Sequence, residues 1–108
     1  MKPEQQNIAI AQACGWTDCR LAIKGAGGGT RSATAHGKPP KRNYEADCPN
    51  YCNDLNAMHK AENSMKIDDL KHYQIMLCDW LSADWGRASA SIRAEAFLRT
   101  LDLWKDDN

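Results

Sequence analysis

Apolar residues recur at helical spacing between residues 67 and 81. Side chains three and four positions apart lie on one side of an α-helix, so such a series predicts an amphipathic helix. The apolar members are Ile67, Leu70, Leu77 and Leu81, with polar Gln74 at the same spacing, and the series is widened by Tyr73, Met76 and Trp80. We therefore expect a helix from about Ile67 to Leu81, with Asp68 and Asp69 at its positive N-terminal end.

A first helix is predicted from about Pro3 to Cys14, because proline is tolerated in the first turn of a helix. Gly15 is placed to end this helix in a left-handed conformation. Trp16 would then fold back over Ala11.

Two further helices are predicted on either side of the 67–81 segment. One begins at Pro49, and its apolar stripe contains Tyr51, Leu55 and Met58. The other is capped by Ser89 or Ser91, and its stripe consists of Ala94, Phe97, Leu98, Leu101 and Trp104.

Residues 17–48 show the least regular pattern. The stretch CRLAIKG alternates enough to predict a short strand with Leu21 and Ile23 on one face. The following GAGGGT breaks regular structure, because ordering consecutive glycines costs much backbone entropy. The stretch HGKPPKRN adds a basic cluster around two prolines. We expect residues 24–47 to form an irregular Gly/Pro-rich basic segment, with a flexible hairpin tip at the glycines.

The fold class that follows is α+β, a helix-rich single domain with about four helices packed on a small sheet. The chain has 108 residues, enough for one hydrophobic core spanning residues 1–108. Fourteen basic and fourteen acidic side chains cancel, which excludes a strong global attraction to nucleic acid or to anionic membranes. No apolar run has the length of a membrane span, and no apolar segment of a signal peptide precedes the first helix. We expect a cytoplasmic protein.

Three blocks of the sequence resemble a known family. NIAIAQACGW, PNYCNDLNAMHKAE and IRAEAFLRTLDLW are similar, in order and spacing, to the phage ABA-sandwich domain family of small bacteriophage and prophage proteins. The resemblance implies a small sheet between helices and a phage origin. It implies no activity and carries over no catalytic residues.

Five cysteines suggest two kinds of thiol chemistry. Cys14, Cys19, Cys48 and Cys52 could supply the four thiolates of a structural zinc site, but their spacings differ from those of the usual zinc knuckles. Core thiols are the favoured interpretation, with no metal and no cofactor. For Cys48 we expect a lowered pKa, because it precedes a predicted helix N-terminus.

Polar residues in the stretch 50–59 fit a scaffold helix better than a site. His59 lies two helical turns after Cys52, and Asp54 is placed to cap the helix or to face solvent. GAGGGTR lacks the Lys-Ser/Thr pair of a phosphate-binding loop.

The candidate binding residues are Lys38, Lys41 and Arg42 in the irregular segment, together with Trp85 between Asp84 and Gly86. The favoured function is a non-catalytic phage or prophage accessory protein that binds a host or defence-system protein, such as an anti-CRISPR-type inhibitor. The alternative is a small nucleic-acid-binding module that uses residues 24–42 and a cysteine zinc site, although three cations support only weak binding. An enzyme acting through Cys48 or Cys52 is the least favoured hypothesis.

Overall fold

A computed structural model of the chain describes residues 1–24, 32–81 and 88–106. Its elements follow the chain in the order α1 (Pro3–Ala13), β1 (Thr17–Lys24), β2 (Ser32–Lys38), β3 (Ala46–Asp47), α2 (Leu55–Asn63), α3 (Ile67–Leu81) and α4 (Ala90–Thr100). The predicted α+β class, with four helices and a small sheet, is confirmed. None of the helices in the described part of the chain is long and apolar enough to span a bilayer.

The end of α1 fixes how the chain enters the sheet. Gly15 adopts a positive φ of 100°, and its N–H donates to the Gln12 carbonyl at 3.1 Å. The Trp16 N–H donates to the Ala11 carbonyl at 3.0 Å. These two hydrogen bonds form a Schellman motif, so the predicted left-handed Gly15 and the return of Trp16 over Ala11 are confirmed.

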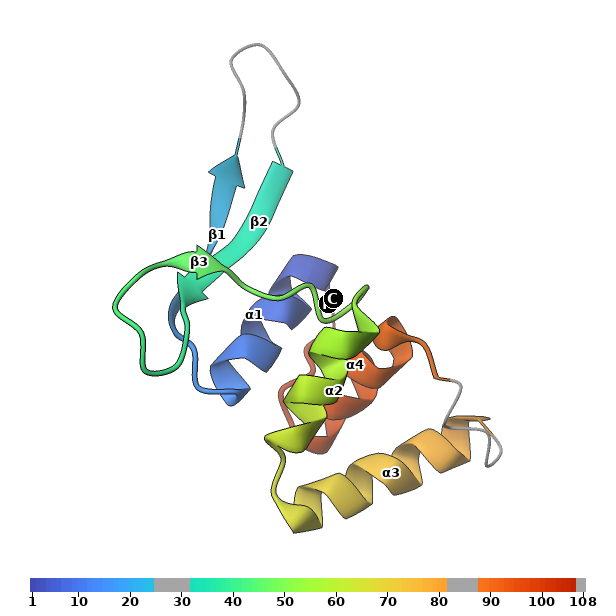
Figure 1. Cartoon of the computed structure of the whole chain (residues 1–108). Helices are drawn as coiled ribbons and strands as arrows, with labels where there is room; N and C mark the ends of the chain where they lie inside the picture. Colours follow the sequence, from blue (N-terminus) through green and yellow to red (C-terminus); the bar gives the residue numbers. More distant parts are fainter. Residues whose placement is uncertain (25–31, 82–87, 107–108) are drawn as a thin grey trace.

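The three strands form one antiparallel sheet in the order β1–β2–β3. β1 and β2 extend away from the helices, and β3 pairs with the base of β2 (Figure 1). The register of β1 shifts between Thr17 and Arg20, so Asp18 and Cys19 together oppose Gly37 of β2. This β-bulge brings Cys19 close to the backbone of Gly37. A Cβ added at Gly37 would lie 3.0 Å from the Cys19 Sγ and 3.2 Å from the Cys19 Cα, so the approach requires glycine.

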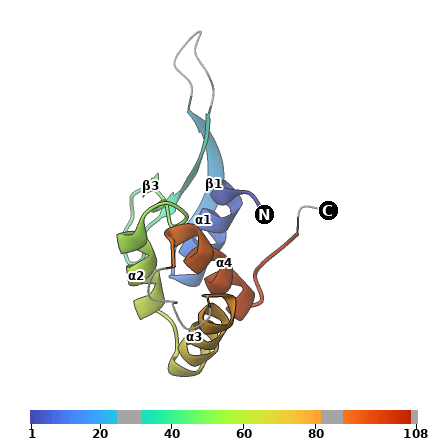
Figure 2. The same ribbon diagram turned by 90° about the vertical axis from the view of Figure 1, so that its right-hand side faces the viewer.

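The two faces of the sheet have different surroundings. α1 contacts both β1 and β2, and the small residues Ala35 and Gly37 are buried. The opposite face carries His36, whose imidazole lies 3.2 Å from Asp47 Oδ1 and 3.4 Å from Glu45 Oε2. Figures 1 and 2 show α2, α3 and α4 gathered at one end of the molecule, with the two long strands projecting from the other. The helices therefore do not enclose the sheet as a sandwich would.

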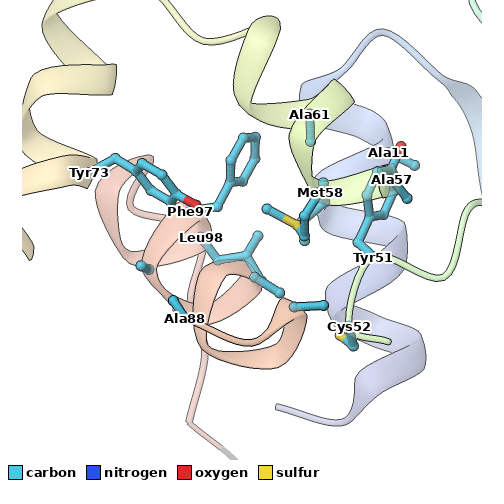
Figure 3. Packing of buried hydrophobic residues seen from close by; sticks show 14 of the residues in the cluster. Ala11, Tyr51, Cys52, Ala57, Met58, Ala61, Tyr73, Ala88, Phe97 and Leu98 are labelled. Atoms are coloured by element: carbon cyan, nitrogen blue, oxygen red, sulfur yellow. The ribbon is translucent and has the colours of Figure 1, made fainter. Parts of the chain in front are cut away.

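The hydrophobic core lies among the helices. Its largest fully buried side chains are Tyr73, Phe97, Ile10, Met58, Leu77 and Leu98. Figure 3 shows Phe97 and Leu98 of α4 directed toward Met58 of α2, with Tyr73 of α3 beside Phe97. The rings of Tyr73 and Phe97 pack edge to face, with centroids 6.5 Å apart.

A buried ion pair joins α2 to α4. The Nη1 atom of Arg93 lies 3.2 Å and 3.1 Å from the two carboxylate oxygens of Glu62, and Nε of Arg93 donates to the Ala88 carbonyl. The Arg93 side chain is almost fully buried and Glu62 is nearly so. Breaking one half of such a pair leaves an uncompensated charge in the interior, so the pair fixes the relative position of the two helices.

Three sequence-based expectations for the helices are corrected. α2 begins at Leu55 rather than Pro49, because the Asp54 carboxylate accepts hydrogen bonds from the N–H groups of Asn56 and Ala57 and caps the helix there. As the first residue of that helix, Leu55 is 41% exposed and lies outside the core. α3 has the predicted bounds, but Trp80 is exposed and Ile67, at its start, is 73% exposed. α3 packs mainly on α4, so one neighbouring helix covers only part of its broad apolar face.

The segment 24–47 is more regular than its composition suggests. Ser32–Lys38 forms strand β2, which lies between β1 and β3. The glycine run and the expected flexible tip fall within residues 25–31, which lie outside the described residues.

Candidate functional site

The connection between β2 and β3 begins with an ordered turn. The Arg42 N–H donates to the Pro39 carbonyl at 3.2 Å, and Lys41 has a φ of 61°. A four-residue turn with proline at the second position and a positive φ at the third has the features of a type II turn. Lys41 occupies the position that usually favours glycine, so its exposed side chain is displayed by a backbone conformation that few residues adopt.

The turn is held against the end of α1. A Cβ added at Gly15 would lie 3.4 Å from Cγ of Pro40, so the proline ring packs against the Gly15 backbone. Tyr44, beyond the turn, is 58% exposed. We use the name recognition turn for residues 39–44, which combine Lys41, Arg42 and Tyr44 on the surface.

The carboxylates beside the recognition turn already have cationic partners. Lys38 Nζ lies 3.2 Å from Asp18 Oδ2, and Arg20 Nη2 lies 2.7 Å from Glu45 Oε2. Hydrogen bonding to Arg20 lowers the pKa of Glu45, and the same contact raises the pKa of Arg20. Of the three predicted basic residues, Lys38 is therefore paired within the sheet, whereas Lys41 and Arg42 stand together on the turn. Trp85 lies outside the described residues.

The four cysteines proposed for zinc are divided among three places. Cys14 Sγ lies 3.4 Å from the Ser64 hydroxyl, and Cys52 donates to Gln6 Oε1 at 3.3 Å. Cys19 and Cys48 interact with each other across the sheet. Within residues 1–24, 32–81 and 88–106, no three His, Cys, Asp or Glu side chains are grouped so that they could hold a metal ion. The geometry gives the zinc hypothesis no support.

The expected lowering of the Cys48 pKa is wrong. Burial raises the pKa of Cys48 to about 12, and the neighbouring Cys19 thiol adds to the shift. The cause is position: α2 starts at Leu55, so Cys48 is not next to its N-terminus. Burial likewise raises the pKa of Cys52 to about 11. At neutral pH both thiols therefore form less thiolate than an ordinary exposed cysteine does.

The polar residues of the stretch 50–59 hold segments of the fold together. Asn7 of α1 donates to Asn50 Oδ1 at 3.2 Å and accepts from the Cys52 N–H at the same distance. Asp54 caps α2, and exposed His59 lies 3.2 Å from Glu62. The interpretation of this stretch as scaffold is supported by these contacts.

The structure has a groove next to the recognition turn that the sequence did not predict. It has a volume of about 440 Å³ and lies between the end of α1, the recognition turn and α2. Its walls include Trp16, Pro40 and Tyr51, which are far apart in the chain. Tyr51 and Cys14 interact at the groove, and burial raises the pKa of Tyr51. The sequence feature that could have indicated this groove is the pair Gly15-Trp16, which places an aromatic side chain at the end of a helix.

Comparisons of this chain with protein-family models, with curated proteins and with solved structures return no match. None of them links the chain to the phage ABA-sandwich family, so that resemblance stays a prediction.

Proposed function

We propose that this chain is a non-catalytic binding protein that attaches to an acidic surface of a partner protein through the recognition turn. The observation that carries the proposal is the display of Lys41, Arg42 and Tyr44 on an ordered turn fixed to α1. Tyrosine and arginine are enriched among the residues that dominate interface energies. A turn that is ordered before binding also lowers the entropy cost of association.

The charge around the turn supports an acidic partner. Asp18 and Glu45 form ion pairs with Lys38 and Arg20. In the part of the chain that the structure describes, no carboxylate is within ion-pair distance of Lys41 or Arg42. These two charges remain for a partner, and they would act mainly on the association rate and on its salt dependence.

The phage origin that the sequence resemblance implies supports a host or defence-system partner. A phage or prophage accessory protein would meet a host or defence-system protein in the cytoplasm of the infected cell, and an anti-CRISPR-type inhibitor is one form of this function. Net charge of zero supports recognition of a local surface over mimicry of DNA, which requires a strongly acidic molecule. Nucleic-acid binding through Lys41 and Arg42 is the competing function, and two cations would make it weak and dependent on salt.

The proposal is tested by capture of host proteins on three immobilised baits. The baits are the wild type, the variant Lys41→Ser/Arg42→Ser, and the control Lys66→Ser/Lys71→Ser, which removes the same charge from exposed positions at the start of α3. We expect a protein that the wild type and the control capture and the turn variant loses. Purified, that protein should bind faster at low than at physiological salt. Identical capture by all three baits, or loss of the captured protein after nuclease treatment, would contradict the proposal.

A further inference from the structure

The groove beside the recognition turn has apolar walls and an open side. Trp16, Pro40, Pro49 and Tyr51 supply much of its lining. Tyr51 is almost fully buried, and Trp16 packs on the core with part of its surface open. A volume of about 440 Å³ lies within the range of sites that hold drug-sized ligands or large side chains. The groove is therefore large enough for one bulky apolar group.

The polar groups at its end are arranged to satisfy one another. The Ser64 hydroxyl donates to the Ala61 carbonyl at 2.6 Å and lies 3.4 Å from Cys14 Sγ. An occupant consequently meets few polar atoms that need a partner. A group without strong hydrogen-bonding capacity fits this end of the groove better than a charged group would.

The charges near the groove are mainly positive. Lys60 of α2 lines one side, and Lys41 and Arg42 follow Pro40, which lines the other. Asp54 also lines the groove, but its carboxylate accepts hydrogen bonds from Asn56 and Ala57 at the positive N-terminus of α2. Three cations in or beside the groove thus stand against this one carboxylate, so the balance of these charges is positive.

We propose that this groove binds one bulky apolar side chain of an acidic segment in the partner protein. The inference rests on the proposed function and specifies its partner: carboxylates on the segment face Lys41, Arg42 and Lys60, while the apolar side chain enters between Trp16 and α2. The cations of the turn directly follow Pro40, which lines the groove, so one continuous segment can reach both them and the pocket. In many interfaces a few residues supply most of the binding energy. Such residues commonly fill a central pocket that polar or charged residues surround.

The test uses three short synthetic peptides as probes. The first consists of aspartate and glutamate around a central leucine, the second has alanine in place of the leucine, and the third places leucine among lysines. Binding is followed by NMR through the backbone amides and the Trp16 indole N–H. We expect the acidic leucine peptide to bind about tenfold more tightly than the alanine peptide and to shift the Trp16 signal, with no binding of the lysine peptide.

Two matched tryptophan substitutions locate the anchor. Asn56 and Asn63 are both exposed residues of α2, but only Asn56 lines the groove. In Asn56→Trp the new side chain should fill the groove and reduce the affinity for the leucine peptide to that for the alanine peptide. In Asn63→Trp the affinity should remain unchanged. Lys60→Glu provides a second groove variant, and it should weaken both acidic peptides.

The outcomes separate this inference from the proposed function. Equal affinities for the leucine and alanine peptides, or equal affinities of Asn56→Trp and wild type for the leucine peptide, would overturn the groove assignment. Free indole is also titrated while the Trp16 signal is followed. If indole bound with the same affinity as the leucine peptide, the groove would be a small-molecule site and the assignment would be overturned. If Lys41→Ser/Arg42→Ser bound both acidic peptides as well as the wild type, the proposed function itself would fail.

Discussion

The helices α2, α3 and α4 bury large side chains, whereas the sheet buries small ones. Tyr73, Phe97 and Leu98 are fully inside the helical part, while the covered face of the sheet contributes Ala35 and Gly37. Burying a large apolar side chain stabilises a fold by about 1.5–3 kcal/mol, and small residues contribute much less. Most of the stability should therefore reside in the helices. The sheet depends on backbone pairing and on its contact with α1.

The two parts also use charge differently. Among the helices, Arg93 and Glu62 are paired in the interior. On the sheet, Arg20 and Glu45 pair at the surface, where both side chains are about half exposed. Exposed pairs contribute little to stability. The comparison indicates that the helical part contributes most of the stability, and that the sheet and its turn contribute less.

The largest effect is expected from Phe97→Ala, with Ile75→Ala as the control on the exposed side of α3. Phe97 is fully buried against Tyr73, so its removal should lower the free energy of unfolding by about 3–5 kcal/mol. Ile75 is 58% exposed, and its removal should cost less than about 1 kcal/mol. Urea denaturation measures both. A large loss at Ile75 would show that α3 has a second partner, such as another copy of the chain.

Leu98→Ala and Leu55→Ala give the next contrast. Both leucines belong to predicted apolar stripes, but Leu98 is fully buried and Leu55 is not. We expect a loss of about 2–5 kcal/mol for Leu98→Ala and below about 1 kcal/mol for Leu55→Ala. Thermal unfolding followed by circular dichroism distinguishes these values. Comparable losses at the two positions would contradict the observed packing of α2.

Gly37→Ala probes the sheet. The added Cβ would lie 3.1 Å from the Thr17 carbonyl oxygen as well as close to Cys19, so the bulge in β1 must shift. We expect a loss of about 1–3 kcal/mol, measured by urea denaturation. NMR shifts should be concentrated in β1 and β2 and leave the amides of α4 unchanged. Changes spread through α4 would show that the sheet and the helices are more tightly coupled than the contacts suggest.

The buried thiols should make stability fall at high pH. The pKa of Cys48 is raised to about 12 and that of Cys52 to about 11, so the folded chain keeps protons that the unfolded chain has lost above pH about 9. Since the unfolded state then binds fewer protons, the free energy of unfolding decreases as pH rises, by up to about 1.4 kcal/mol per pH unit for each thiol. Denaturation curves of the wild type, Cys48→Ala and Cys52→Ala between pH 8 and pH 10.5 should show shallower slopes in the variants. Unchanged slopes would refute the assignment.

The smallest effect is expected from Lys41→Ser/Arg42→Ser. Both side chains are exposed on the recognition turn, and their backbone conformation is set by Pro40 and the hydrogen bond from Arg42 to Pro39. The melting temperature should change by no more than about 2 °C, because exposed charges contribute little to stability. A decrease of several degrees in the melting temperature would mean that the turn contributes to the stability of the fold. It would contradict the difference in stability between the helices and the sheet.

The helices were the part of the fold that the sequence could predict. α3 has the expected bounds Ile67–Leu81, and Ser89 caps α4 as one of the two predicted serines, because helical spacing and capping are local signals. Pro49 was misleading because proline is compatible with a first helical turn. Its segment instead forms turns that bury Tyr51, and the side chain of Asp54 determines where α2 begins.

Strand β2 and the groove could not be predicted in the same way. The sequence SATAHGK alternates Ala33, Ala35 and Gly37 with polar residues, but side chains this small give only a weak strand signal. The segment becomes a strand because β1 and β3 pair with it on both sides. The walls of the groove come from α1, the recognition turn and α2, so no single stretch of sequence contains the signal. The basic residues Lys41 and Arg42 were identified, but separating them from Lys38 required the position of Asp18.

The bulge at Asp18 and Cys19 also bears on whether this chain stays separate from its own copies. In the described sheet β1 is an outer strand, and an outer strand offers unpaired N–H and C=O groups to any other strand that lies flat beside it. Asp18, with a φ of 53°, interrupts the straight run of β1, and the other outer strand, β3, is only two residues long. The regular edge of β1 is thereby limited to residues 20–24, and β3 offers an edge of two residues. The irregularity that brings Cys19 against Gly37 thus also shortens the length of edge that another strand could pair with.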